Sequence, residues 1–147
     1  MPRSRPDPAA VADRLHSAAI HLLRRLRKED EATGLSASRL SALSVVVFAG
    51  SVTIGQLSDA EQVSGPTMTR LLVGLERDGL VRRERDAHDG RVTWVHPTSK
   101  GARILKEGRR RRVAVLAHAL ATLDGAKLAG LARAADLIEQ IATRGAR

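Results

Sequence analysis

A predicted helix that begins after Ser64 carries side chains that could contact the edges of base pairs. Its apolar residues recur at i, i+3, i+4 and i+7, which predicts one buried face. These residues are Met68, Leu71, Leu72 and Leu75. The opposite face carries Pro66, Thr67, Arg70, Gly74 and Arg77. Because arginine pairs well with guanine in the major groove, we expect Thr67 and Arg70 to face bases. The alternative is an ordinary solvated helix face.

The first turn of this helix has its own signals. Ser64 can cap the helix, and Pro66 lies in the first turn, where its missing N–H leaves no hydrogen bond unmade. Ser64 and Thr69 suit either contacts with phosphates or helix capping. Gly74 lacks a side chain and would let another surface approach closely.

A hairpin is predicted directly after the helix. Residues 81–85 and 92–96 alternate in polarity or carry β-branched side chains, and Asp89-Gly90 between them is a strong turn signal. Arg91, at the tip, could enter a narrow minor groove, with Asp89 holding it through a charge-assisted hydrogen bond. The alternative is a surface ion pair of little energetic worth.

The elements that must position these residues follow from periodicity and caps. An apolar stripe predicts a helix from residue 8 to Gly34, and a second helix spans about residues 36–49. Thr53 and Gln56 fit a capping box for a short helix that ends near residue 62. A four-residue turn then leads to the helix after Ser64. A short helix, a tight turn, a second helix and a hairpin make a winged helix-turn-helix.

Two more helices are predicted after the hairpin. Thr98 can cap a long helix that ends near residue 120, and Asp124 can cap a last helix. The first and last helices of the chain carry apolar stripes that have too little partner surface within one small lobe. We therefore expect them to form the interface of an obligate dimer.

Composition narrows the class of protein. The chain has 147 residues, a net charge of +9 and no cysteine, which excludes disulfides, thiolate metal sites and cysteine nucleophiles. A strongly basic small protein attracts nucleic acid. However, residues 54–101 carry 7 basic and 7 acidic groups, so the excess lies in the flanks. No apolar run approaches the roughly 18 residues of a membrane span, and we expect a cytoplasmic protein without a membrane partner.

Other charged residues have open roles. Arg83 and Arg85 fit either phosphate contacts or pairing with aspartates. The four arginines from Arg109 to Arg112 wrap round a helix, so they fit a solvated or dimer-bridging stretch better than a phosphate site.

The acidic and histidine residues give little support for catalysis. Glu84, Asp86, His88 and Asp89 are the only local group that could hold a metal, and they lie on a hairpin without a second supporting segment. We expect a solvated turn, no metal, no cofactor and no catalytic residue. His16, His21 and His118 fit packed or surface positions better than ligand or pH sensing.

An ordered set of motifs resembles the MarR family of bacterial repressors. They are Ser64-Gly-Pro-Thr67-Met-Thr69-Arg70-Leu71-Leu72, Leu75-Glu76-Arg-Asp-Gly79-Leu80-Val81, Asp89-Gly90-Arg91 and Thr98-Ser-Lys-Gly101. The resemblance implies a two-fold dimer on a pseudo-palindromic operator, with the wing arginine, here Arg91, in the minor groove. It also implies a small-molecule effector that releases DNA. The lack of cysteine departs from the branch that senses oxidation, and the shortage of aromatic residues argues against a pocket that stacks aromatic ligands.

These observations define one expected protein. We expect a mainly α fold with a small two- or three-stranded β-wing, in which residues 1–8 form a flexible tail. Residues 36–101 form the DNA-binding domain, and residues 9–35 and 102–147 form the helical dimerisation region. The expected function is a homodimeric transcription repressor that is not an enzyme. Its expected DNA contacts are Ser64, Pro66, Thr67, Thr69, Arg70, Arg77, Arg85, Asp89 and Arg91. A sequence-independent nucleoid-binding or protein-interaction module is the alternative.

Overall fold

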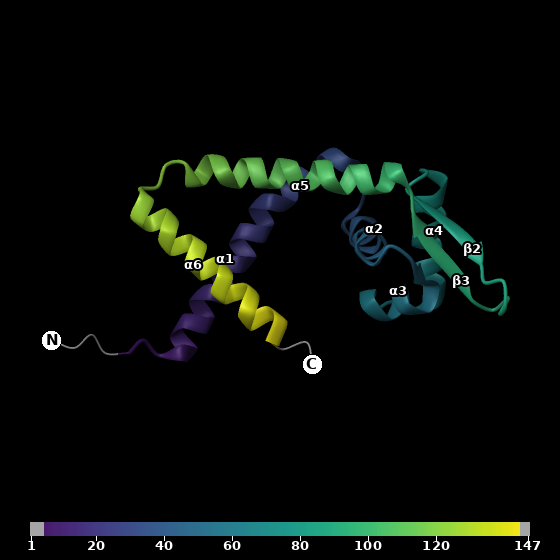
Figure 1. Ribbon diagram of the computed structural model, residues 1–147, viewed down its shortest axis with the longest axis horizontal. Helices are drawn as coiled ribbons and strands as arrows, with labels where there is room; N and C mark the ends of the chain where they lie inside the picture. Colours follow the sequence, from purple (N-terminus) through teal and green to yellow (C-terminus); the bar gives the residue numbers. More distant parts are fainter. Residues whose placement is uncertain (1–4, 145–147) are drawn as a thin grey trace. The chain divides into compact units, whose positions relative to one another are not determined.

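The computed structural model describes residues 5–144 (Figure 1). These residues form six α-helices, one 3₁₀ helix and a small three-stranded sheet. In chain order the elements are α1 (Pro8–Arg27), η1 (Lys28–Thr33), α2 (Ala37–Ala49), β1 (Val52–Thr53), α3 (Ile54–Glu61), α4 (Gly65–Arg77), β2 (Val81–Arg85), β3 (Thr93–Pro97), α5 (Ser99–Leu120) and α6 (Gly125–Arg144). The mainly helical fold with a small β-wing is confirmed. The chain divides within α5 into two compact units, one ending at Arg111 and the other beginning at Arg112.

The N-terminal helix differs in two ways from the sequence prediction. It begins at Pro8, inside the expected tail, because the Asp7 carboxylate accepts hydrogen bonds from the N–H groups of Ala9 (3.2 Å) and Ala10 (3.3 Å). Residues 1–4 of that tail lie outside the described residues. The prediction of one helix to Gly34 was wrong in its last turns, which form η1. There the Thr33 hydroxyl donates to the carbonyl of Asp30 (2.6 Å), and such local bonds compete with the α-helical pattern.

The helix-turn-helix is built from the caps that the sequence predicts. Thr53 and Gln56 form the complete capping box, in which each side chain accepts the other residue's backbone N–H, at 3.1 and 2.9 Å. Helix α3 ends at Glu61, and the C-cap residue Gln62 has a left-handed backbone (φ 53°). The Ser64 hydroxyl then accepts the N–H of Thr67 at the start of α4. The short turn between two capped helices sets the direction of α4.

The wing is a three-stranded antiparallel sheet with the order β1-β3-β2. Strand β2 lies where residues 81–85 were expected, and Arg83 pairs with Val95. Strand β3 starts at Thr93 rather than at Val92, because Val92 closes the loop through its N–H to Asp89 (2.9 Å) and its carbonyl to Asp86 (2.9 Å). The two residues of β1 pair with Val95 and Trp94.

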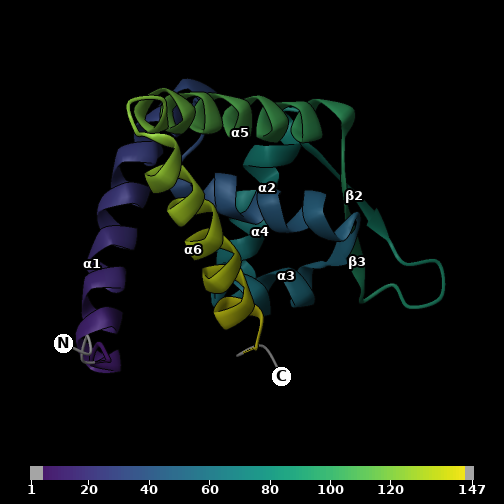
Figure 2. The same cartoon turned by 60° about the vertical axis from the view of Figure 1, so that its left-hand side comes forward.

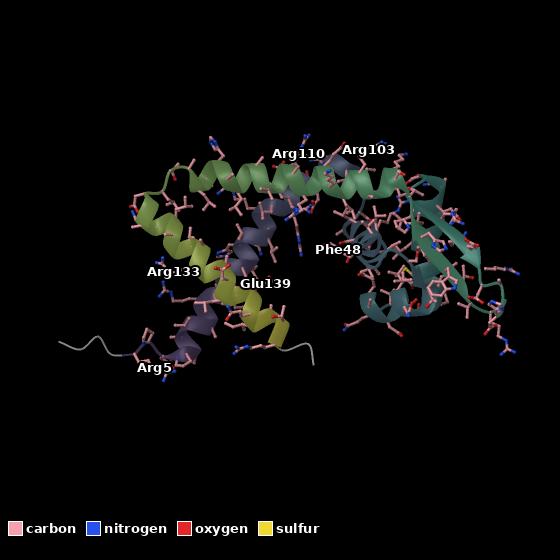
Figure 3. All side chains as sticks on the ribbon, in the orientation of Figure 1. Arg5, Phe48, Arg103, Arg110, Arg133 and Glu139 are labelled. Carbon is pink, nitrogen blue, oxygen red and sulfur yellow. The ribbon has the colours of Figure 1, made fainter. Side chains whose placement is uncertain are left out.

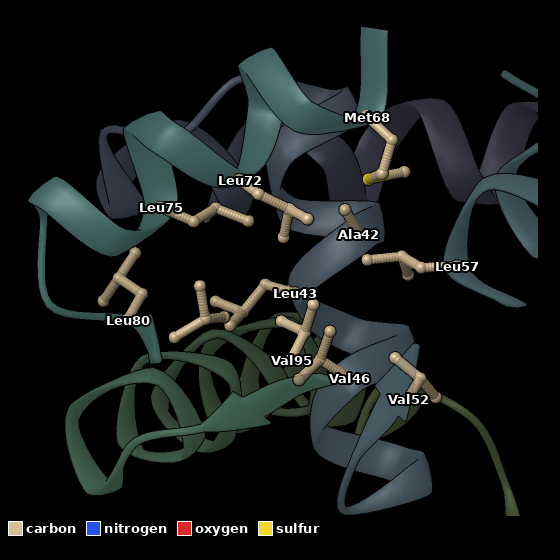
Figure 4. Close-up of a cluster of buried hydrophobic side chains, with 11 residues drawn as sticks. Ala42, Leu43, Val46, Val52, Leu57, Met68, Leu72, Leu75, Leu80 and Val95 are labelled. Atoms are coloured by element: carbon tan, nitrogen blue, oxygen red, sulfur yellow. The ribbon is translucent and has the colours of Figure 1, made fainter. Parts of the chain in front are cut away.

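A single apolar cluster lies between the helices and the sheet (Figure 4). The fully buried side chains come from α2 (Leu43, Val46), α3 (Leu57), α4 (Met68, Leu72, Leu75), the segment after α4 (Leu80) and β3 (Val95). Leu71, which was expected on the buried face of α4, is only half-buried. Its position beside the core rather than in it leaves part of this side chain on the surface of α4.

A close approach joins the end of α4 to the start of α5. The Thr98 hydroxyl donates to the carbonyl of Gly79 (2.6 Å) and accepts the N–H of Gly101 (3.1 Å). The N–H of Thr98 donates to the carbonyl of Leu80 (3.2 Å). A Cβ atom at Gly101 would overlap the carbonyl oxygen of Leu80 and lie 3.1 Å from Leu43 Cδ1. Backbone cannot yield as a side-chain tip can, so only glycine fits at position 101.

Among residues 5–144, no single helix combines the length and apolar character needed to cross a membrane. Pro8–Thr33 and Ala37–Ala49 meet both criteria only as a pair, and they are bent by 87° with respect to each other.

We predict that Gly101→Ala lowers the free energy of unfolding by about 2 kcal/mol or more, because the added methyl group forces the start of α5 away from Leu80. Urea denaturation followed by circular dichroism measures the change. Gly55→Ala is the matched control, since the only atom near a Cβ there is Thr53 Oγ1 at 3.9 Å. Equal stability of the two variants would contradict the close approach.

Candidate nucleic-acid interface

The exposed face of α4 carries most of the residues expected to contact DNA. Pro66, Thr69, Arg70 and Arg77 are exposed, and Thr67 is half-buried. The apolar side chain of Val73 is also half-exposed on this face, which was not predicted from the sequence. A shallow hollow of about 500 Å³ runs along the helix. Its lining residues are Arg39, Thr67, Arg70, Leu71, Val73, Gly74 and Arg77.

The N-terminal turn of α4 has a local hydrogen-bond network. The hydroxyls of Ser64 and Thr67 lie 2.9 Å apart, and the Arg70 Nε–H donates to the carbonyl of Pro66 (3.5 Å). Ser64 therefore acts as the helix cap, which was one of its two expected roles. These contacts hold the side chains at the helix end that enters the major groove in helix-turn-helix proteins.

Arg39 reaches this face from α2, and no sequence pattern predicts its position there. Its Nη2 donates to Asp78 Oδ2 (2.9 Å), and its guanidinium covers the backbone of Gly74. A Cβ atom at position 74 would overlap Nη2 and lie 2.9 Å from Cζ. The space that Gly74 leaves open, expected to admit an approaching surface, is thus occupied by Arg39 in the free protein.

An ion pair ties α4 to the first strand of the wing. Glu76 accepts hydrogen bonds from Arg83 Nε (2.8 Å) and from the N–H of Arg83 (3.1 Å), and Nη2 lies 2.7 Å from the same carboxylate. The side-chain hydrogen bond from Arg83 holds the pKa of Glu76 below its usual value. The partner of Arg83 is therefore a glutamate on α4 rather than an aspartate, and this pair fixes β2 against the helix.

The loop of the wing is organised around Asp86. One carboxylate oxygen accepts the N–H groups of His88 (2.8 Å) and Asp89 (3.0 Å), and the other accepts Trp94 Nε1–H (2.8 Å). The bond from Trp94, followed by those from the backbone, lowers the pKa of Asp86. Since both oxygens are engaged within the hairpin, Asp86 shapes the loop that carries Arg91.

Asp89 acts on Arg91 through the backbone. Its carboxylate accepts the main-chain N–H of Arg91 (3.0 Å), and the structure gives no ion pair between Asp89 and the Arg91 guanidinium among the described residues. Arg85 and Arg91 are both exposed on the wing. The expected charge-assisted clamp is thus replaced by a turn that presents the arginine side chain to solvent.

A second polar group on the wing lies around His96 and lines the same hollow as Asp86 and Trp94. His96 Nδ1 is 2.7 Å from the Ser51 hydroxyl, and its Nε2 is 3.4 Å from Glu84. Glu84 also accepts a hydrogen bond from Arg82 (2.7 Å), and that bond is the main cause of its lowered pKa. Within residues 5–144 no three His, Asp or Glu side chains come together as a metal site would require.

The four arginines from Arg109 to Arg112 on α5 lie on different faces of the helix, as helical geometry predicts. Arg109 and Arg110 are exposed, whereas Arg111 and Arg112 are half-buried. Arg103 and Arg110, seven residues apart, share one exposed face of α5 (Figure 3). None of the four arginines lines the hollow on α4.

The packed pair α3–α4 with an adjacent hairpin defines a winged helix-turn-helix domain, in which α4 is the recognition helix (Figure 2). A family model of the MarR family matches residues 33–92. An uncharacterized HTH-type transcriptional regulator from Mycobacterium leprae is 38% identical over 133 residues, which cover 90% of this chain and 93% of that protein. The chain belongs to the MarR family of transcription regulators.

Solved structures agree with this assignment. A putative transcriptional regulator from Pseudomonas aeruginosa is 33% identical, with a TM-score of 0.78 and coverage of 93% of this chain and 98% of the other. A transcriptional regulator from Thermotoga maritima has a TM-score of 0.80 at 22% identity, with coverage of 93% and 96%. The family consists of non-enzymatic regulators, so the expectation that the chain is not an enzyme is confirmed.

We predict that the fluorescence of Trp94, the only tryptophan, reports the ionisation of Asp86. Because the folded wing lowers this pKa, its hydrogen bonds are fully present above the usual aspartate pKa and are lost as the pH falls through the lowered value. An acid titration should therefore show an emission change with a midpoint below the usual aspartate pKa.

Two variants check the origin of this signal. Asp86→Asn should give the altered emission already at neutral pH. Asp89→Asn should leave Trp94 unchanged, since the Asp89 carboxylate accepts the N–H of Arg91 and makes no hydrogen bond with Trp94 or Asp86 among the described residues. Far-UV circular dichroism at each pH distinguishes a local change at the wing from global unfolding. A midpoint at or above the usual aspartate pKa would refute the assignment.

Proposed function

We propose that this protein is a homodimeric repressor that binds a pseudo-palindromic operator in the cytoplasm. The observation that carries the proposal is the polar face of α4, which carries Thr67 and Arg70 in its N-terminal half, together with the exposed wing arginine Arg91. Thr67 and Arg70 would contact base edges, and Arg91 would enter the minor groove. The remaining proposed residues would contact the phosphate backbone of the DNA or orient the side chains that do so. They are Ser64, Pro66, Thr69, Arg77, Arg85 and Asp89. Among structural neighbours, a MepR variant from Staphylococcus aureus was solved bound to an oligodeoxyribonucleotide.

The dimer is supported by two helices that lack a core of their own. Neither α1 nor α6 has a buried residue, and each exposes large apolar side chains, such as Leu23 (56%) and Ile141 (68%). Most of the stability of a helix in a protein comes from packing of its apolar face against other elements, and a second copy would supply that packing. Sedimentation equilibrium at micromolar concentration tests this, and a monomer would exclude it. The proposed dimerisation region is residues 9–35 and 102–147.

We propose further that a small molecule releases the DNA. One structural neighbour, NadR, was solved with 4-hydroxyphenylacetate. A thermal-shift screen of phenolic acids, dyes and antibiotics, followed by DNA binding in the presence of each hit, tests the proposal. It fails if no compound both stabilises the protein and weakens DNA binding.

We predict that the protein prefers its own upstream DNA to a shuffled duplex of equal length by roughly 10³-fold or more, with affinity falling steeply as salt rises. Fluorescence anisotropy across a salt series measures both. Arg70→Ala should cost about 1–3 kcal/mol on the specific duplex and reduce the preference, because a base contact is lost. Arg91→Ala should weaken binding as well.

Arg103→Ala is the control, because it removes the same charge from an exposed position on α5 outside the proposed contacts. It should leave the preference unchanged. Equal affinity for both duplexes would favour a sequence-independent nucleoid-binding role, and no binding at low salt would favour a protein-interaction module.

A further inference from the structure

We infer that Arg39, on α2, binds a DNA backbone phosphate beside the recognition helix, and that Asp78 and Gly74 hold it in position for this contact. The inference rests on the proposed DNA binding and adds a contact from outside the helix-turn-helix and the wing. It stands on the hydrogen bond from Arg39 to Asp78, on the fit of the guanidinium over Gly74, and on the hollow that Arg39 helps to line.

The backbone of α4 provides the seat for this side chain. At Gly74 the surface of the helix has no Cβ, and the guanidinium lies so close that a methyl group would displace it. Arg39 lies 39 residues before Asp78 in the sequence, and its side chain is only 20% exposed. A side chain already fixed in this way loses little rotamer entropy when it binds a ligand.

The anchor of Arg39 is itself fixed. Asp78 lies at the C-terminal cap of α4, and its carbonyl accepts a hydrogen bond from Lys100 Nζ (2.8 Å). Its second carboxylate oxygen lies 3.5 Å from Arg77 Nε. Two arginines thus share one carboxylate, which leaves a surplus positive charge at this end of the hollow. An anion is the ligand that this charge favours.

The position along α4 favours a phosphate over a base. Thr67 and Arg70 occupy the N-terminal end, which meets base edges in this class of domain. Gly74 lies seven residues after Thr67, about 10 Å further along the helix at 1.5 Å per residue. There a helix lying across the major groove reaches the sugar-phosphate wall. Arg39 Nη2 is engaged with Asp78, and the rest of the planar fork remains to donate to phosphate oxygens.

Three variants test the inference in the anisotropy assay, with the full-length protein, the upstream duplex and the shuffled duplex. Arg39→Ala should weaken binding to both duplexes by a similar factor, about 5- to 20-fold, and should reduce the salt slope by roughly 0.9, the value expected for one lost phosphate contact. Gly74→Ala keeps every charge but displaces the guanidinium, so it should weaken binding too.

The double variant Arg39→Ala/Gly74→Ala identifies the cause. Once Arg39 is absent, a methyl group at position 74 has no guanidinium to displace, so the double variant should bind as Arg39→Ala does. Arg103→Ala is the control for loss of charge. Thermal unfolding of each variant shows that the protein is folded at the assay temperature, and Gly74→Ala still tests the inference if Arg39→Ala is unfolded.

Each contrary result has a distinct meaning. If Arg39→Ala binds like Arg103→Ala, Arg39 makes no DNA contact. If only the preference for the upstream duplex falls, the phosphate assignment is wrong and Arg39 reads a base. A further loss from Gly74→Ala in the Arg39→Ala background would show that Gly74 itself faces DNA. If the wild-type protein binds neither duplex, the proposed function fails and the role of Arg39 fails with it.

Discussion

The close approach of α5 to the Leu80 carbonyl is the constraint on which the winged helix-turn-helix domain depends. Gly79 has a positive φ of 72° and turns the chain out of α4, and Thr98 then bonds to Gly79, Leu80 and Gly101 at once. Since β2 leaves this junction and β3 returns to it, the junction sets where the wing starts relative to α4. A side chain at position 101 would displace both the junction and the start of the wing.

The wing is then held at two more points along its length. The Glu76–Arg83 pair fixes the middle of β2 to α4, and Asp86 gathers Trp94 and the loop backbone near the tip. Both carboxylates have a lowered pKa, so both stay ionised at neutral pH and keep their donors engaged. Hairpins of two strands are marginal in isolation. These anchors, with the two residues of β1, fix the backbone of the hairpin that carries Arg91.

The sequence predicted best what local interactions determine. Caps at Ser64, Thr98 and Asp124 act over three or four residues, so residue types and spacing suffice to find them. The end of α1 was missed because side-chain bonds around Thr33 favour a 3₁₀ turn over an otherwise good helical pattern. The seat of Arg39 on Gly74 could not be predicted, since it joins α2 to α4 through tertiary packing that leaves no periodic signal. The prediction that Arg83 pairs with an aspartate was wrong for the same reason.

The neutral charge balance of residues 54–101 does not contradict binding to a polyanion, because binding depends on where the charges lie and not on their sum. Most acidic groups near the wing and α4 are used internally: Glu76 by Arg83, Glu84 by Arg82 and Asp86 by Trp94. Arg70, Arg85 and Arg91 are exposed, and the ion pairs of the described residues do not include them. The field at a surface depends on such local placement and not on the sum. The acidic residues of this domain therefore fix its helices and strands in position, and the exposed arginines are available to bind DNA.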